Sequence, residues 1–170
     1  MLIFSDTHLP LKLLSLIRNQ EHLSDIQLII NLIASIATAL GIILAAIGLW
    51  LTKTQAVTSF EDNVSNEYRQ IVKSIPVSAL LGDELSDEEY AKSLNAIYNY
   101  IDFSNEQIYL RKEGRIRETT WNNWADGIET NLNRSAVKKA WGAIKEKSPN
   151  SFSELQKLEE TSFKSDPKSW

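Results

Sequence analysis

The sequence contains no cysteine, and its two histidines, His8 and His22, both lie near the N-terminus. The absence of cysteine excludes disulfide scaffolds, thiol nucleophiles and cysteine-ligated zinc or iron–sulfur sites. Because residues 54–170 lack histidine, catalytic triads and two-histidine metal motifs are excluded there. The six glycines are scattered, so there is no glycine-rich phosphate loop. We therefore expect no cofactor and no enzymatic activity.

Charge is also missing from one long stretch, because residues 26–51 contain no Asp, Glu, Lys or Arg. This run of 26 residues exceeds the roughly 20 that a helix needs to cross a ~30 Å hydrocarbon core. A signal peptide would have an apolar region of about 7–15 residues and a small-residue cleavage site. Trp50 and Lys53 at the end of the run are typical of an interfacial anchor. The sequence predicts a single-pass protein of the lipid bilayer, with a transmembrane helix over residues 26–52.

Small or polar side chains recur inside this helix at positions alternately four and three residues apart. They are Gln27, Asn31, Ala34, Thr38, Gly41, Ala45, Gly48 and Thr52, and we call them the small/polar stripe. A seven-residue repeat follows one face of a helix that supercoils slightly to the left. Lipid provides no hydrophobic drive for helix association, so small residues and polar groups mark contact faces. The stripe therefore predicts a homo-oligomer, the simplest partner for a single helix being another copy.

Two forms of the oligomer fit the stripe, and a third interpretation needs no oligomer. In a tightly packed bundle, Gly41, Ala45 and Gly48 are the crossing points. In a wider ring, Gln27, Asn31 and Thr38 line a polar pore, and the protein perturbs the membrane. The third interpretation is a monomeric anchor that tethers an adaptor domain, which recruits a cytosolic protein.

Residues 1–25 combine several leucines with a few charges, which predicts an amphipathic segment that lies at the membrane interface after Pro10. Residues 1–53 carry three basic and three acidic groups, so the positive-inside rule gives no orientation. We expect the C-terminal domain to be cytoplasmic at the cell inner membrane, since export of a folded domain would need a stronger charge bias.

The domain after the membrane helix, residues 53–161, has helical periodicity throughout, so the fold class is all-α. Residues 54–170 hold 15 basic and 19 acidic groups, an excess that argues against binding nucleic acid. We expect helices over 54–75, 87–113, 117–132, 135–147 and from about 152, with a turn at Val77–Leu81 and inward-facing tryptophans. Capping boxes are predicted at Ser86/Glu89 and Ser151/Glu154, and a left-handed stop at Gly114. Residues 162–170 are predicted to be a flexible tail.

One polar cluster in this domain is a candidate site. Asn99, Asp102 and Glu106 recur at helical spacing, with Arg111 following. Two carboxylates four residues apart can bind a divalent cation, given oxygen ligands from another helix, or act in acid–base chemistry. An enzyme that uses Asp102 and Glu106 is therefore a further alternative. The competing interpretation is a solvated face, or ion pairs from these carboxylates to Arg111, Arg115 or Arg117.

Three segments resemble a group of small bacterial membrane proteins. They are NYIDFSNEQIYLRKEGRI at 99–116, WNNWADGI at 121–128 and AW at 140–141. The resemblance covers residues 95–145 and implies one N-terminal membrane helix and a helical cytoplasmic domain of about a hundred residues. The group has no assigned reaction, so no catalytic residue carries over. Its layout is similar to that of small membrane effectors in bacterial antiviral defence.

Overall fold

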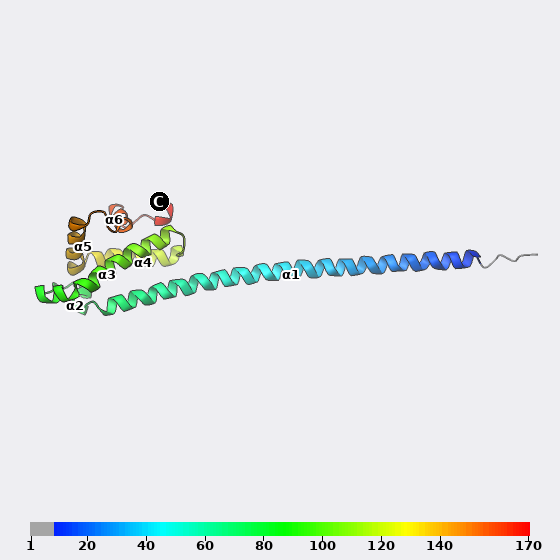
Figure 1. Cartoon of the computed structure of the whole chain (residues 1–170), viewed down its shortest axis with the longest axis horizontal. Coiled ribbons are helices and arrows are strands. Elements are labelled where there is room, and N and C mark those ends of the chain that lie inside the picture. The colour runs from blue at the N-terminus through cyan, green and yellow to red at the C-terminus, as the bar shows by residue number, and fades with distance from the viewer. Residues whose placement is uncertain (1–8) are drawn as a thin grey trace, which may run out of the picture. The chain divides into compact units, whose positions relative to one another are not determined.

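The computed structural model describes the backbone from Leu9 and the side chains from Leu13 to the C-terminus, and it is all-α (Figure 1). The chain divides into two compact units, Met1–Lys53 and Thr54–Trp170. The predicted fold class is confirmed. The helices are α1 (Leu9–Lys73), α2 (Val77–Leu81), α3 (Asp87–Lys112), α4 (Glu118–Leu132), α5 (Ser135–Lys147) and α6 (Ser153–Glu160), followed by a 3-10 turn, η1 (Pro167–Ser169).

α1 is one helix of 65 residues, which begins at Leu9 and has no break where the N-terminal segment 1–25 meets the predicted span. A proline is tolerated in the first turn, because the amide that it lacks would have no helical partner there. Residues 1–8 of the predicted amphipathic segment lie outside the described residues. The helix is long and apolar enough to cross a membrane, with a mean hydropathy of 2.5 in its most apolar 18-residue window.

α1 ends at Lys73, two residues before the predicted end, because its last turn tightens ahead of Pro76. Ser74 and Ile75 donate to carbonyls three residues back, at 3.0 Å each. The predicted turn at Val77–Leu81 is instead one turn of helix, α2, which stops at Gly82 with φ 93°. Proline is well suited to begin it, since its fixed φ already matches the geometry of a helix start.

The capping box at the start of α3 is confirmed. The Ser86 hydroxyl accepts the amide of Glu89 at 3.3 Å, and the Glu89 carboxylate accepts the amide of Ser86 at 3.1 Å. At the other end, Gly114 has φ 69°, and the amides of Gly114 and Arg115 donate to the carbonyls of Arg111 and Leu110. The left-handed stop that was predicted at Gly114 is therefore also present.

The second predicted capping box, Ser151/Glu154, is wrong. The residue that precedes α6 is Phe152, which has a left-handed backbone (φ 57°) and offers no side-chain cap. The third amide of the helix, that of Leu155, instead donates to the Asn105 side chain of α3 at 3.1 Å. Glu154 forms an ion pair with Lys112 at 2.7 Å. A cap from a distant helix therefore replaces the local one.

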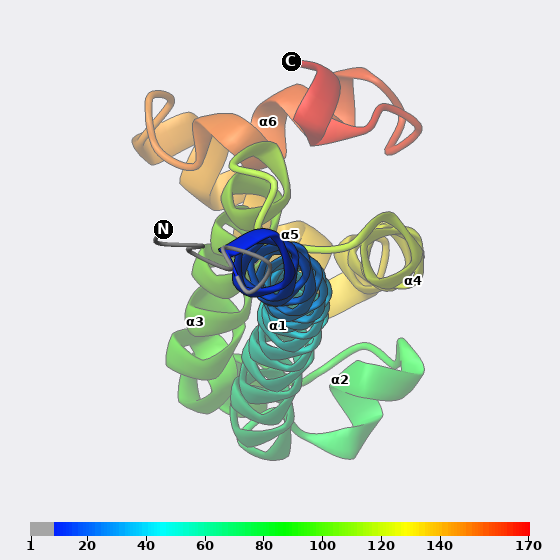
Figure 2. The ribbon, with the colours of Figure 1, turned by 90° about the vertical axis from the view of Figure 1, so that its right-hand side faces the viewer.

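The core of the unit Thr54–Trp170 is built around α3, which contacts α4, α5, α6 and η1 (Figure 2). Buried isoleucines on α3 meet apolar side chains of the surrounding helices; the core includes Ile97, Ile101, Ile108, Trp121, Ile128, Leu132, Trp141, Leu155 and Leu158. Trp121 and Trp141 are buried as predicted, whereas Trp124 is only partly buried.

The predicted flexible tail, residues 162–170, differs from the structure, in which it packs against α3. Pro167 is buried, and Asp166 forms an ion pair with Arg111 of α3. The indole of Trp170 donates to Ser165 at 3.0 Å and lies beneath the ammonium group of Lys157. The sequence of the tail is polar, and its partners lie far away in the chain, so local pattern alone does not indicate this packing.

Replacing one glycine at a helix end and one inside a helix tests the left-handed stop of α3. Gly114 has φ 69°, so Gly114→Ala should lower the free energy of unfolding by about 1 kcal/mol, because a Cβ disfavours this backbone. Gly142 lies inside α5 with open space around an added Cβ, so Gly142→Ala should raise it by about 1 kcal/mol. Urea unfolding of the full chain in detergent, followed by circular dichroism, measures both, and equal signs would contradict the assignment.

Candidate functional site

The small/polar stripe lies on a part of α1 that is exposed throughout. Every side chain from Leu13 to Ala56 is exposed, including the whole uncharged run. Two threonines of the stripe satisfy their hydroxyls inside the helix: Thr38 donates to the Ala34 carbonyl at 2.8 Å, and Thr52 to that of Gly48 at 2.9 Å. A Cβ added at Gly41 or Gly48 would meet nothing within 4 Å, so both glycines leave the helix surface open.

The two side-chain amides of the stripe form no such hydrogen bond within the helix. Among the residues that the structure describes, the side chains of Gln27 and Asn31 form no hydrogen bond and are exposed. Each amide carries two donors and a carbonyl acceptor. In an apolar solvent an unpaired group of this kind costs about 2–7 kcal/mol. In an apolar surrounding these two amides would therefore need partners from outside the helix, whereas Thr38 and Thr52 would not.

The predicted polar cluster on α3 is not brought together as one site. Asn99, Asp102 and Glu106 are exposed, whereas Arg111 is buried, with 4% of its surface accessible. The alternative that Arg111 or Arg117 pairs with Asp102 or Glu106 is wrong, because Arg111 pairs with Asp166 and Arg117 with Glu61. Side chains 13–170 contain no group of three or more acidic or histidine residues that could hold a metal ion.

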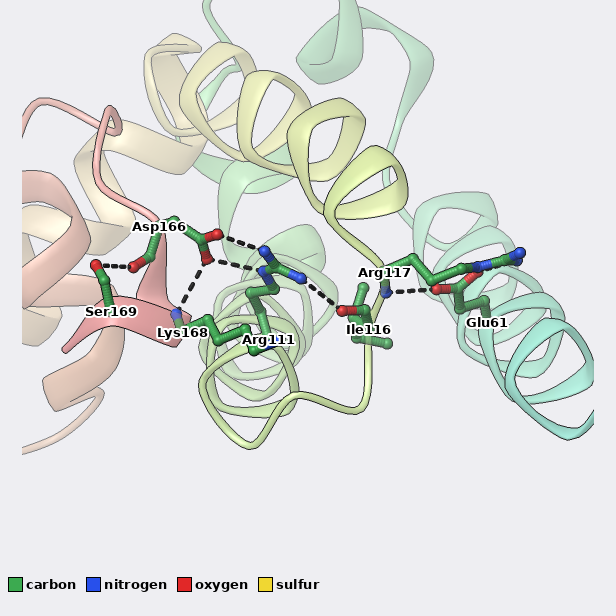
Figure 3. A network of polar contacts seen from close by, with 7 residues as sticks. All are labelled: Glu61, Arg111, Ile116, Arg117, Asp166, Lys168 and Ser169. Atoms are coloured by element: carbon green, nitrogen blue, oxygen red, sulfur yellow. Dashed lines mark hydrogen bonds and ion pairs between the residues drawn. The ribbon is translucent and has the colours of Figure 1, made fainter. Parts of the chain in front are cut away.

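Arg111 and Asp166 form a fork of hydrogen bonds between α3 and the C-terminal tail, in which Arg111 is buried and Asp166 is partly exposed (Figure 3). The guanidinium donates through Nε to Oδ1 of Asp166 at 2.8 Å and through Nη2 to Oδ2, and through Nη1 to the Ile116 carbonyl at 2.8 Å. Asp166 also accepts the amide of Lys168 at 3.0 Å. These hydrogen bonds, those of Arg111 first, hold the pKa of Asp166 below its ordinary value.

A second ion pair joins α1 to the start of α4. The carboxylate of Glu61 is almost fully buried and faces Arg117 (Figure 3). It accepts hydrogen bonds from the Arg117 amide at 2.7 Å, from Arg117 Nε at 2.9 Å and Nη2 at 2.5 Å, and from the Thr120 hydroxyl at 3.0 Å. Burial raises the pKa of this carboxyl, but the hydrogen bonds of Arg117 and Thr120 outweigh burial, and the pKa lies below its ordinary value. Glu61 is therefore a buried carboxylate that stays ionised.

Glu61 and Asp166 are the polar residues that the sequence did not reveal. Their partners lie 56 and 55 residues away along the chain, and nothing in local spacing connects them. The sequence contains one indication for Glu61. It directly follows Phe60, which belongs with Val57 and Val64 to the apolar stripe of the first predicted helix. A carboxylate on a buried face requires a partner.

A groove of about 280 Å³ lies between α1, α3 and α4, entirely within the unit Thr54–Trp170. Its walls are mainly aromatic and amide side chains, and include Tyr68, Tyr100, Gln107, Trp124 and Asn131, with Arg69 also lining it. The ring of Tyr68 lies 6.4 Å from that of Tyr100. Burial raises the pKa of Tyr100 to about 12, so its hydroxyl is neutral and can donate a hydrogen bond.

No protein family, no curated protein and no solved structure matches this chain. The resemblance of residues 95–145 to small bacterial membrane proteins therefore stays a prediction. The features of the chain that bear on its function are the exposed stripe, the two ion pairs and the groove.

The Glu61 ion pair gives a pH-dependent prediction. Glu61→Gln should lower the free energy of unfolding at pH 7 by about 2 kcal/mol, because it removes a charge-assisted contact to Arg117. A carboxyl whose pKa is lowered in the folded state stabilises the fold at pH values above its unfolded-state pKa. This contribution is lost as the pH falls through the folded-state pKa. The difference between wild type and variant should therefore shrink below pH 4.5, the ordinary value for glutamate.

The measurement is urea unfolding of the full chain in detergent at pH 7 and at lower pH values, followed by circular dichroism. Glu67→Gln is the matched control, since Glu67 is an exposed residue of the same helix and has no ion pair among the described residues. A loss that is equal for both variants, or that does not depend on pH, would contradict the assigned role of Glu61.

Proposed function

We propose that this chain is a non-enzymatic, single-pass membrane protein that forms homo-oligomers through the small/polar stripe of α1. The proposal places its helical domain in the cytoplasm, at the inner membrane of a bacterial cell. The stripe carries the proposal, since it is the one face of the apolar helix that combines close-approach residues with unpaired amides. Contact between such a face and lipid stabilises the helix little, whereas contact with a second helix stabilises an oligomer.

The unpaired amides favour an oligomer over a monomeric anchor. Gln27 and Asn31 are exposed on α1, at adjacent positions of the stripe, and lack partners among the described side chains. In a symmetric assembly the same residues of each copy meet around the axis, so each amide can pair with its counterpart. A lone helix would leave these amides to lipid or to headgroups.

The way that the helical domain packs also leaves room for self-association. If the seven-residue spacing is continued beyond the membrane, it reaches Gln55, Ser59, Asp62 and Asn66, all of which are exposed. The bundle packs on other positions of α1, among them Glu61 and Val64, which are buried. The face that continues the stripe is therefore polar and uncovered within the unit Thr54–Trp170.

Bulky residues on the stripe should weaken the oligomer. Gly41→Ile with Gly48→Ile should reduce the mass of the full-length protein in detergent, because the added side chains separate helices that pack at these glycines. The measurement is native mass spectrometry or cross-linking. Ala39→Ile with Ala46→Ile is the matched control, since these alanines lie on the opposite face of the helix and should leave the mass unchanged. An unchanged mass in the glycine variant would refute the proposal.

The two kinds of polar residue in the stripe should behave differently. Asn31→Leu should shift the monomer–oligomer equilibrium in detergent toward the monomer by about 1 kcal/mol, because it removes hydrogen bonds between helices. Thr38→Val should have a smaller effect, since the Thr38 hydroxyl already bonds to the Ala34 carbonyl within its own helix. Dilution series followed by mass photometry or cross-linking compare the two, and equal effects would contradict the interhelical role of Asn31.

A further inference from the structure

Gln107 is a largely buried glutamine whose amide opens onto the groove and has no partner among the described residues. Its side chain on α3 is 4% exposed and lines the groove between α1, α3 and α4, and within residues 13–170 it forms no hydrogen bond. No side-chain nitrogen or oxygen of residues 13–170 is both fully buried and unpaired, so the Gln107 amide is accessible from the groove. A ligand in the groove can therefore pair with this amide in place of water.

The groove offers a second amide and neutral aromatic surface. Asn131 on α4 also lines the groove and is 8% exposed. Side-chain amides present a donor beside an acceptor, which is the arrangement that recognises the edge of a nucleobase. Tyr68 and Trp124 are both partly buried and line the same groove, and aromatic rings of this kind stabilise a stacked base by about 1–3 kcal/mol.

The charge of the groove favours an anion. Arg69 is its one charged lining residue among the described residues, although the surrounding unit has 19 acidic and 15 basic groups. Because Arg69 is exposed, an anionic group beside it would remain near water while the rest of the ligand is buried. The volume of about 280 Å³ is close to the lower limit for small-ligand sites, and it suits one nucleotide better than a polymer.

We propose that this groove binds a mononucleotide, with the base between Tyr68 and Trp124, its edge on the amides of Gln107 and Asn131, and the phosphate beside Arg69. The site goes beyond the proposed membrane function. It lies wholly in the unit Thr54–Trp170, so binding does not depend on association of the membrane helices. One wall of the site belongs to α1, the helix that also carries the stripe.

The test is isothermal titration calorimetry of the full-length protein in detergent with AMP, GMP, CMP and UMP, and with the matching nucleosides. At least one mononucleotide should bind saturably, with one molecule per chain, and more tightly than its nucleoside. If none of the four saturates, the proposal is refuted. The Gly41→Ile and Gly48→Ile variant should keep this binding, so failure of the oligomer and failure of the site are distinguishable.

Gln107→Leu separates a binding role from a structural one. The variant should weaken the affinity by about tenfold, because the base loses its buried hydrogen-bonding partner. Its thermal unfolding temperature in detergent should be unchanged, since within residues 13–170 the Gln107 side chain has no hydrogen bond to lose. An unchanged affinity would overturn the proposal, whatever the unfolding temperature.

Two further variants test the space and the charge. Gly127 lines the groove, and an added Cβ would meet nothing within 4 Å, so Gly127→Leu should fill the groove and abolish binding. Gly142→Leu, on α5 and with equally open surroundings, is the matched control. Arg69→Ala should remove the preference for nucleotide over nucleoside, and Lys73→Ala should keep it. Binding that survives Gly127→Leu, or a preference that survives Arg69→Ala, would contradict the assignment.

Discussion

The carboxylate of Glu61 determines how the helical domain is attached to α1. α1 meets the rest of the bundle through side chains, and at this point a buried negative charge must be compensated, since an unpaired charge in the interior costs several kcal/mol. Arg117 and Thr120 provide that compensation with four side-chain and backbone donors from the start of α4. Arg115 lies 4.2 Å from the ring of Phe60, the residue before Glu61, and adds a second cation at the same place.

The short connection between α3 and α4 brings this ion pair together with that of the C-terminal tail. Arg111 donates to the Ile116 carbonyl, and the next residue, Arg117, donates its amide to Glu61 (Figure 3). The connection is therefore bonded on one side to Arg111 of α3, which also holds the tail, and on the other side to α1. Gly114 allows the chain to turn sharply enough for residues 116 and 117 to reach both partners. Within the unit Thr54–Trp170, this five-residue connection links the two ion pairs.

The features that the sequence predicted correctly join residues that are close along the chain, whereas the features that it missed join distant residues. The helices, the Ser86/Glu89 capping box and the Gly114 stop depend on residues within a few positions of one another, so their patterns are visible. The partners of Arg111 and Arg117 are chosen by tertiary packing, and helical spacing wrongly suggested the nearby carboxylates of Asp102 and Glu106. The Ser151/Glu154 pattern failed for a related reason, because Asn105, distant in sequence, caps α6 in its place.

α1 carries different surfaces in its uncharged part and in the part beyond Lys53. In the uncharged part, apolar side chains surround a stripe whose amides need partners, whereas beyond Lys53 the same spacing gives polar residues that water satisfies. The positions that bind the bundle, such as Glu61, Val64 and Tyr68, are distinct from that spacing. Beyond Lys53, the face of α1 that packs on the bundle therefore differs from the face that continues the stripe spacing. The two faces meet at Arg69, which follows Asn66 at that spacing and also lines the groove.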